Sequence, residues 1–76
     1  MEERILAILE DANDEIIDYD GDNMIEDGII DSFGLIDIVY SLEEEFGIEI
    51  DASLVLAENF GNKEKIIALI ESLIEE

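Results

Sequence analysis

The 76-residue sequence contains no cysteine, no histidine, no proline and no tryptophan. Without cysteine the chain can form no disulfide and offers no thiolate ligand. Without histidine it lacks the usual base at neutral pH and the commonest metal ligand. A chain of this length supplies one small domain with no room for the walled cleft of an enzyme. We therefore expect a single domain over residues 1–76 that is not an enzyme and has no catalytic residue.

Basic residues are also scarce, because only Arg4, Lys63 and Lys65 stand against 23 Asp and Glu, which gives a formal net charge of −20 at pH 7. Hydrophobic residues nevertheless make up 49% of the chain, far more than in disordered acidic segments, so the chain should fold. Its surface would repel nucleic acid and anionic lipid and attract basic surfaces. We expect a monomer that binds partners with positive patches and does not bind nucleic acid.

Long apolar runs are missing as well. No run approaches the ~20 residues that a membrane-spanning helix needs. The acidic start, Met1-Glu2-Glu3, lacks the basic and apolar regions of a signal peptide. The expected location is the cytoplasm, with no insertion into a membrane.

The first part of the chain reads as a helix followed by a long loop. Helical spacing of Ile5, Ile8, Leu9 and Ala12 predicts an amphipathic helix from Glu2 to about Asp14, which Ile16 extends by another turn. The stretch 18–23 is crowded with turn-forming residues. Apolar pairs follow on both sides of Gly28, so we expect a long loop that is pinned to the core by Met24-Ile25 and Ile29-Ile30.

Two further helices are predicted after this loop. The second begins at Asp31 or Ser32, either of which is a good N-cap, and ends at Gly47. Asn62 can cap the last helix. The apolar positions of the two helices are Leu35, Ile38, Val39, Leu42 and Phe46, and Ile66, Ile67, Leu69, Ile70, Leu73 and Ile74.

The segment between these two helices completes the predicted fold. Residues 48–50 alternate like a strand but have no convincing pairing partner, and residues 52–61 fit a connection that contains one short helix. The sequence therefore predicts an all-α fold, a small antiparallel four-helix bundle of three longer helices and one short one.

The acidic loop invites a calcium interpretation that its details do not support. Asp18, Asp20 and Asp22 occupy positions 1, 3 and 5 of a helix-loop-helix calcium motif. Position 6 is Asn23 where the sharp turn needs Gly, and position 12 is Ile29 where a bidentate Glu is required. We expect no dedicated metal site, although concentrated carboxylates can bind divalent cations weakly and without specificity.

Ser32 is the most informative polar residue, because it stands between a long loop and the clearest helix. The usual role of a serine at a helix start is to cap it. The same place also suits a phosphate diester, which would meet free backbone N–H groups and the positive end of the helix dipole. The residues by themselves leave both interpretations open.

The second helix carries a second apolar stripe, made of Phe33, Ile36 and Tyr40, displaced from its main apolar face. One interpretation is a broad core face that the long loop covers. The other is a surface that docks a partner, with a rim of negative charge supplied by Asp37, Glu43 and Glu44.

Two motifs, Asp31-Ser32-Phe33 and the run from Leu42 to Ile50 (LEEEFGIEI), closely resemble the acyl carrier protein family, and the resemblance covers nearly the whole chain. It implies an acidic four-helix bundle in which Ser32, flanked by Asp31, carries a 4′-phosphopantetheine arm donated by coenzyme A. The arm would supply the thiol that this chain lacks and hold cargo as a thioester. The resemblance also implies docking through the second helix, at Phe33, Ile36, Asp37, Tyr40, Glu43 and Glu44.

The implied partners are a phosphopantetheinyl transferase and enzymes with basic surfaces that transfer acyl or aminoacyl groups. Our leading hypothesis is an acyl carrier of fatty-acid or related lipid biosynthesis. The chain departs from the family pattern at Phe33, at Asp51 and over residues 52–59, which form a slightly longer stretch than in fatty-acid carriers. Residues 57–60 look more like those of free-standing carriers of aminoacyl or specialised acyl groups, so the nearest alternative is a D-alanyl or other aminoacyl carrier. A third hypothesis, of another class, is an unmodified acidic adaptor that binds a basic partner through the same surface.

Overall fold

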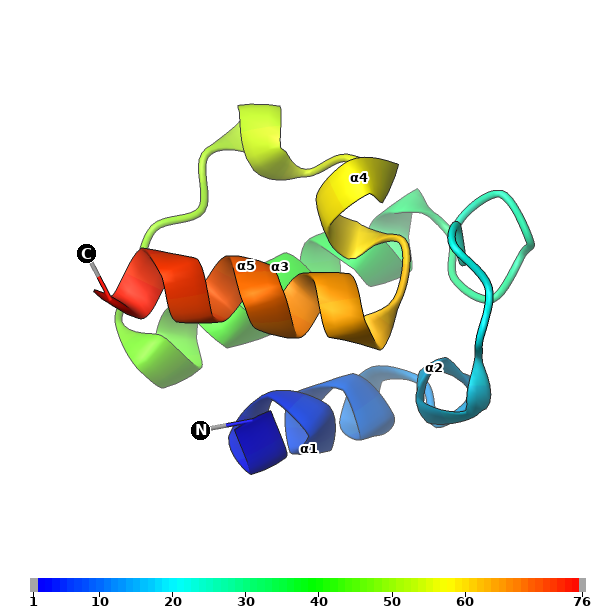
Figure 1. The fold of residues 1–76 in the computed structure, drawn as a ribbon, viewed down its shortest axis with the longest axis horizontal. Helices are drawn as coiled ribbons and strands as arrows, with labels where there is room; N and C mark the ends of the chain where they lie inside the picture. The colour runs from blue at the N-terminus through cyan, green and yellow to red at the C-terminus, as the bar shows by residue number, and fades with distance from the viewer. Residues whose placement is uncertain (1, 76) are drawn as a thin grey trace.

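The computed structural model describes residues 2–75, so the first and last residues of the expected domain 1–76 lie outside the described residues. Its elements are all helical, as the sequence predicts, and they follow one another as drawn in Figure 1. In chain order they are α1 (Glu2–Ala12), α2 (Glu15–Asp18), α3 (Ser32–Phe46), the 3₁₀ helix η1 (Ala52–Leu54), α4 (Ala57–Phe60) and α5 (Lys63–Glu75). Three helices are long, as expected.

The predicted first helix is divided into α1 and α2, so the expectation of one helix that continues to Asp14 and Ile16 is wrong. Asn13 explains the division. Its side-chain oxygen accepts a hydrogen bond from the Glu15 N–H at 2.9 Å, and its side-chain Nδ2 donates to the carbonyl of Ile29 at 2.8 Å. Local side-chain bonds of this kind compete with a continuous helix. Ile16 is still fully buried, because α2 turns it into the core.

Residues 19–31 form the long connection between α2 and α3, the cyan to green loop of Figure 1. The connection is pinned to the core by Met24 and Ile30, which are both buried, as predicted. It is also tied to the start of α5. The Met24 N–H donates to the carbonyl of Gly61 at 2.9 Å, and the Asn62 side chain donates to the carbonyl of Gly21 at 2.9 Å.

Gly61 is required by this close approach. A Cβ atom at this position would lie 1.9 Å from the carbonyl oxygen of Asp22 and 2.5 Å from that of Ala57. Both contacts are with backbone atoms, which cannot move aside as a flexible side chain can. Only glycine lets the long connection approach the junction of α4 and α5 so closely.

The ends of α3 and α5 follow the predicted signals. Gly47 ends α3 in the left-handed conformation, with φ of 63°, and its N–H donates to the carbonyl of Glu43. Asn62 caps α5, because its side-chain oxygen accepts a hydrogen bond from the Lys65 N–H at 2.9 Å.

Residues 48–50, between α3 and α4, form no strand, as predicted. Two short elements follow, η1 and α4, where the sequence predicted one short helix. Asp51 begins η1, and the hydrogen bond from the Ser53 N–H lowers the pKa of its carboxyl group. Phe60 at the end of α4 is fully buried and joins this segment to the core.

The core lies where α1 packs against α3 and α5 and where α4 packs against α5. Within residues 2–75 every buried side chain is hydrophobic and no buried side-chain polar atom lacks a hydrogen bond. None of the helices in this part of the chain is long and apolar enough to cross a membrane. The buried residues are Ile5, Leu9, Ile16, Met24, Ile30, Leu35, Ile38, Leu42, Ile50, Phe60, Ile66 and Ile70.

Candidate attachment site and docking surface

Ser32 is the first residue of α3, and Asp31 is its N-cap. Asp31 has an extended backbone, and its side-chain Oδ1 accepts a hydrogen bond from the Gly34 N–H at 2.8 Å. The cap is therefore Asp31, which decides between the two residues that the sequence allowed. Ser32 is exposed, and its hydroxyl makes no hydrogen bond within residues 2–75. The usual role of a helix-start serine is already filled by its neighbour.

The backbone around Ser32 suits a phosphate group. The first N–H groups of a helix have no intrahelical acceptor. Asp31 accepts from Gly34 and its carbonyl accepts from the Leu35 N–H at 3.0 Å, whereas the N–H groups of Ser32 and Phe33 meet no acceptor in the described part of the chain. An exposed hydroxyl, two free N–H groups and the positive end of the helix dipole fit a phosphodiester that leaves the protein for solvent.

The second apolar stripe of α3 faces solvent. Phe33 is 78% exposed, Ile36 is 57% exposed and Tyr40 is 66% exposed. The long connection does not cover them, so the interpretation of a broad core face is wrong for these three residues. An exposed apolar stripe on an acidic helix has the composition of a transient interface.

The acidic residues predicted beside this stripe have different surroundings. Asp37 and Glu44 are exposed. Glu43 is half-buried, and its carboxylate accepts a hydrogen bond from the Ile50 N–H at 2.7 Å. Glu43 thus ties the segment after α3 to the helix, a contact that the sequence did not predict. The exposed negative charge comes from Asp37 and Glu44.

Leu56 is an exposed apolar residue that the sequence analysis did not single out. It is 50% exposed and occupies the N-cap position of α4, where it makes no side-chain cap. Leucine is among the poorest N-cap residues. The sequence predicts one short helix within residues 52–61 without its start, so the exposed position of Leu56 is seen only in the structure.

Tyr19 joins two parts of the acidic loop through its hydroxyl group. The Tyr19 hydroxyl donates a hydrogen bond to Asp27 at 2.5 Å and accepts one from the Asn23 N–H at 2.9 Å. Partial burial raises the pKa of Tyr19 above its ordinary value, and the bond to Asp27 raises it further. Among residues 2–75, no three or more Asp, Glu, His or Cys are grouped so that they could hold a metal ion.

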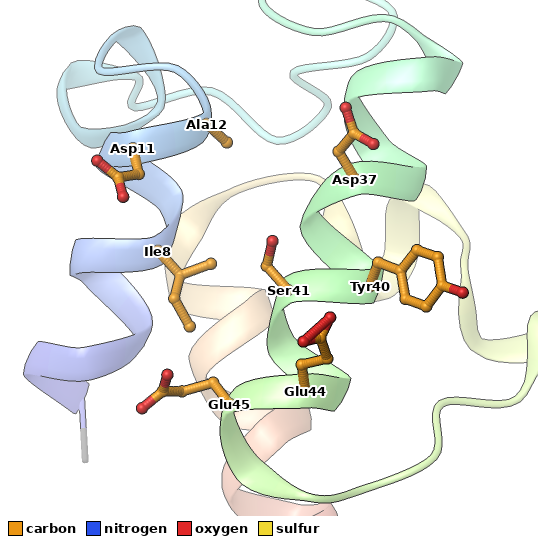
Figure 2. Close-up of a pocket in the computed structure, with 8 residues that line it drawn as sticks. All are labelled: Ile8, Asp11, Ala12, Asp37, Tyr40, Ser41, Glu44 and Glu45. Atoms are coloured by element: carbon orange, nitrogen blue, oxygen red, sulfur yellow. The ribbon is translucent and has the colours of Figure 1, made fainter.

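Asp37 and Glu44 also border a groove between α1 and α3, shown in Figure 2. The groove has a volume of about 660 Å³. Ile8 and Ser41 point into the gap between the two helices (Figure 2). The remaining lining residues are Asp11, Ala12, Tyr40 and Glu45.

Comparison with known proteins finds relatives that are carrier proteins. The chain is 32% identical over 73 residues to the D-alanyl carrier protein of Lactobacillus acidophilus, which covers 95% of this chain and 92% of that protein. It is 31% identical over 70 residues to D-alanyl carrier protein 1 of Lactiplantibacillus plantarum, covering 91% and 88% of the two chains. With the D-alanyl carrier protein of Enterococcus faecalis it shares 29% identity over 75 residues, 96% of each chain.

No family model and no solved structure gives a significant match. The curated relatives nevertheless cover nearly the whole chain, and proteins of this kind carry a phosphopantetheine group in general. Their identity to this chain and the all-helical fold agree with the resemblance found in the sequence. The chain belongs to the family of acyl-carrier-like proteins that bind phosphopantetheine.

Proposed function

We propose that this protein is a D-alanyl carrier that holds the amino acid as a thioester on a phosphopantetheine arm attached to Ser32. The observation that supports the attachment is the exposed hydroxyl of Ser32 at the start of α3, which forms no hydrogen bond within residues 2–75 and lies beside two N–H groups that meet no acceptor there. The D-alanyl cargo is supported by the names of the relatives. These relatives favour the aminoacyl hypothesis over the fatty-acid hypothesis that led the sequence analysis.

The residues around Ser32 have a defined part in the attachment. A phosphopantetheinyl transferase would remove the Ser32 hydroxyl proton. The Ser32 oxygen would form a bond to the diphosphate phosphorus of coenzyme A that carries the pantetheine, and the bond from this phosphorus to adenosine 3′,5′-bisphosphate would break. The N–H groups of Ser32 and Phe33 would stabilise the negative charge of the resulting phosphodiester. When bound, the arm supplies the thiol that forms the thioester, which the chain cannot supply because it has no cysteine. Asp31 positions this site by holding the first turn of α3.

The exposed side of α3 would receive the partner enzymes. Phe33, Ile36 and Tyr40 supply an apolar centre, and Asp37 and Glu44 supply charge that attracts a basic surface. The proposed partners are the transferase and the enzymes that load and remove the aminoacyl group. Charge of one sign around the site would speed their encounter with the carrier.

The attachment is tested by intact mass after incubation with coenzyme A and a broad-specificity phosphopantetheinyl transferase. The wild-type protein should gain one phosphopantetheine group. Ser32→Ala should gain none, whereas the matched control Ser72→Ala, at an exposed position of α5, should be modified like the wild type. If the wild-type protein gained no mass under conditions that modify a control carrier, the result would favour the hypothesis of an acidic adaptor that carries no phosphopantetheine. Modification of Ser32→Ala would place the site elsewhere.

The cargo is tested on protein isolated from its host. Hydroxylamine cleaves the thioester and releases the load as its hydroxamate, so intact mass before and after cleavage gives the mass of the load. Chiral analysis after hydrolysis of the hydroxamate identifies any amino acid. The proposal predicts D-alanine. Release of a fatty acyl group would reject the D-alanyl assignment and support the fatty-acid hypothesis.

A further inference from the structure

A second pocket begins next to Ser32, where the long connection joins the start of α3 (Figure 1). Asp31 and Gly34, the residues before and shortly after Ser32, both line it. The pocket has a volume of about 440 Å³. Its apolar surface comes from the connection and from the inner face of α3, at Ile25, Ile29, Ile30 and Ile38.

The walls of this pocket are held in place by contacts within the chain. The side chain of Asn13, at the end of α1, donates a hydrogen bond to the carbonyl of Ile29 at 2.8 Å and so joins two parts of the lining. Ile38 is fully buried and Ile30 is only 8% exposed, so the lining is continuous with the core. A pocket that is already formed costs little reorganisation when a ligand enters.

Several residues of the lining offer hydrogen-bond acceptors that have no donor. Within residues 2–75 the carbonyl groups of Ala12, Gly28 and Ile30 accept no hydrogen bond. Ala12 ends α1, where the helix dipole places partial negative charge. Asp31 adds a carboxylate, of which Oδ1 accepts from the Gly34 N–H and Oδ2 accepts from no group in the described part of the chain.

The chain itself supplies no cation to these acceptors. Among the described residues no basic side chain lines the pocket. Arg4 bonds to Glu45, near the opposite end of α3, and both lysines belong to α5. Carbonyl and carboxylate oxygens beside a small apolar surface suit an ammonium group that carries a short apolar substituent, because the ammonium has three donors and no acceptor.

We propose that this pocket holds the D-alanyl group of the loaded carrier. The ammonium of the cargo would lie among the free carbonyl groups and the Asp31 carboxylate, and its methyl group would contact Ile25 and Ile29. The inference rests on the proposed function and deepens it, because it gives the aminoacyl group a binding site on the carrier itself. A fatty acyl group has no ammonium and would leave these acceptors unpaired.

The length of the arm allows this arrangement. Between phosphorus and sulfur, phosphopantetheine contains about 13 bonds, which span roughly 15 Å when extended. The first turn of α3 rises only about 5.4 Å. A flexible arm on Ser32 can therefore fold back over the start of α3, where Asp31 and Gly34 line the pocket.

The test compares two loaded forms of the full-length protein, labelled with ¹³C and ¹⁵N. One form carries D-alanine and the other carries a propionyl group, which has the same carbon skeleton without the amino group. An amide replaces the thioester in both, so that the load stays attached at about pH 6.5, where the amino group is protonated. Relative to the protein with the bare arm, D-alanine should shift the amide signals of Gly28, Ile29 and Ile30. Nuclear Overhauser contacts should join its methyl group to Ile25 and Ile29, and the propionyl form should show neither effect.

Two matched substitutions on α1 test whether the pocket is the site. Ala12→Lys places an ammonium at the lining, and Ala7→Lys makes the same change at an exposed position of α1 outside it. Ala12→Lys should abolish the shifts caused by D-alanine, whereas Ala7→Lys should keep them. Asp31→Asn removes the carboxylate charge and keeps an equally good N-cap, so it should reduce the shifts while α3 stays capped.

Three results would overturn the inference. They are equal shifts with the D-alanyl and propionyl loads, equal shifts in Ala12→Lys and Ala7→Lys, and no contact between the alanyl methyl group and the lining. The proposed function is judged separately. The mass gained at Ser32 and the chirality of the cargo isolated from the host do not depend on where that cargo rests.

Discussion

Ile36 and Ile38 lie two residues apart on α3 and have opposite surroundings. Ile38 has no exposed surface and packs in the core with Leu35 and Leu42, whereas Ile36 is 57% exposed beside Phe33 and Tyr40. Isoleucine therefore has a different role at each of these two positions of α3. The inner face of α3 stabilises the fold, and the outer face is free to meet another protein, so changes on the two faces should have separable effects.

The largest effect is expected from Ile38→Ala on the inner face. Removing a fully buried isoleucine side chain leaves a cavity, and such substitutions cost about 2–5 kcal/mol of unfolding free energy. Urea unfolding followed by circular dichroism measures the loss. The milder Ile38→Val should cost about 0.5–1.5 kcal/mol. Equal stability of Ile38→Ala and wild type would contradict the assignment of this face to the core.

A smaller effect is expected from Asp31→Ala, which changes the N-cap residue of α3. The substitution removes the acceptor for the Gly34 N–H and should lower the unfolding free energy by about 1 kcal/mol. The control is Asp37→Ala, which removes the same charge from the same helix at an exposed position that is not a cap. A loss of stability for Asp37→Ala as large as that for Asp31→Ala in urea unfolding would show that capping is not the cause.

Added salt should raise the thermal stability by screening surface charges, without changing the packing of the core. Screening of the net charge of −20 reduces self-repulsion in the compact state, so the thermal midpoint should rise by a few degrees, equivalent to less than ~1 kcal/mol. Scanning calorimetry in increasing sodium chloride measures the shift. A midpoint that stays constant or falls would show that repulsion among these carboxylates does not limit stability.

The smallest effect on stability is expected from Ile36→Ala. Surface substitutions of this kind usually change the unfolding free energy by less than about 0.5 kcal/mol. The measurement is the same urea unfolding, with Ile38→Ala as the comparison. A loss as large as that of Ile38→Ala would mean that the outer stripe is buried in solution and is not available to a partner.

The sequence predicted those parts of the fold that local signals determine. The start of α3 at Asp31 or Ser32, its end at Gly47 and the cap at Asn62 each depend on residues within one turn of the helix end, although only the structure shows that Asp31 is the cap. The division between α1 and α2 could not be predicted in this way. It depends on Asn13, whose side chain bonds to Ile29, sixteen residues away along the chain.

The candidate site, too, was predicted only where local signals determine it. Helical spacing separated the two stripes of α3, but spacing alone cannot say which stripe faces the core. That is decided by the packing of α1 against α3, and by a connection that leaves Ile36 uncovered. Nor did spacing reveal that Glu43 bonds to the Ile50 N–H, because the path of residues 48–50 is set by the whole fold. Ser32 stood out in the sequence, but its unbonded hydroxyl was visible only once Asp31 was seen to be the cap.

The close approach at Gly61 has a consequence for the order of folding. The bond from Asn62 to Gly21 joins residues 41 positions apart, so forming it early would carry the entropy cost of closing a long loop. The connection that leads into Asp31 should therefore settle late, after the long helices have packed. On the ribosome, residues 21–24 could form these bonds only after Gly61 and Asn62 have been synthesised, which makes the connection a late-forming feature of a chain that is otherwise built from local helices.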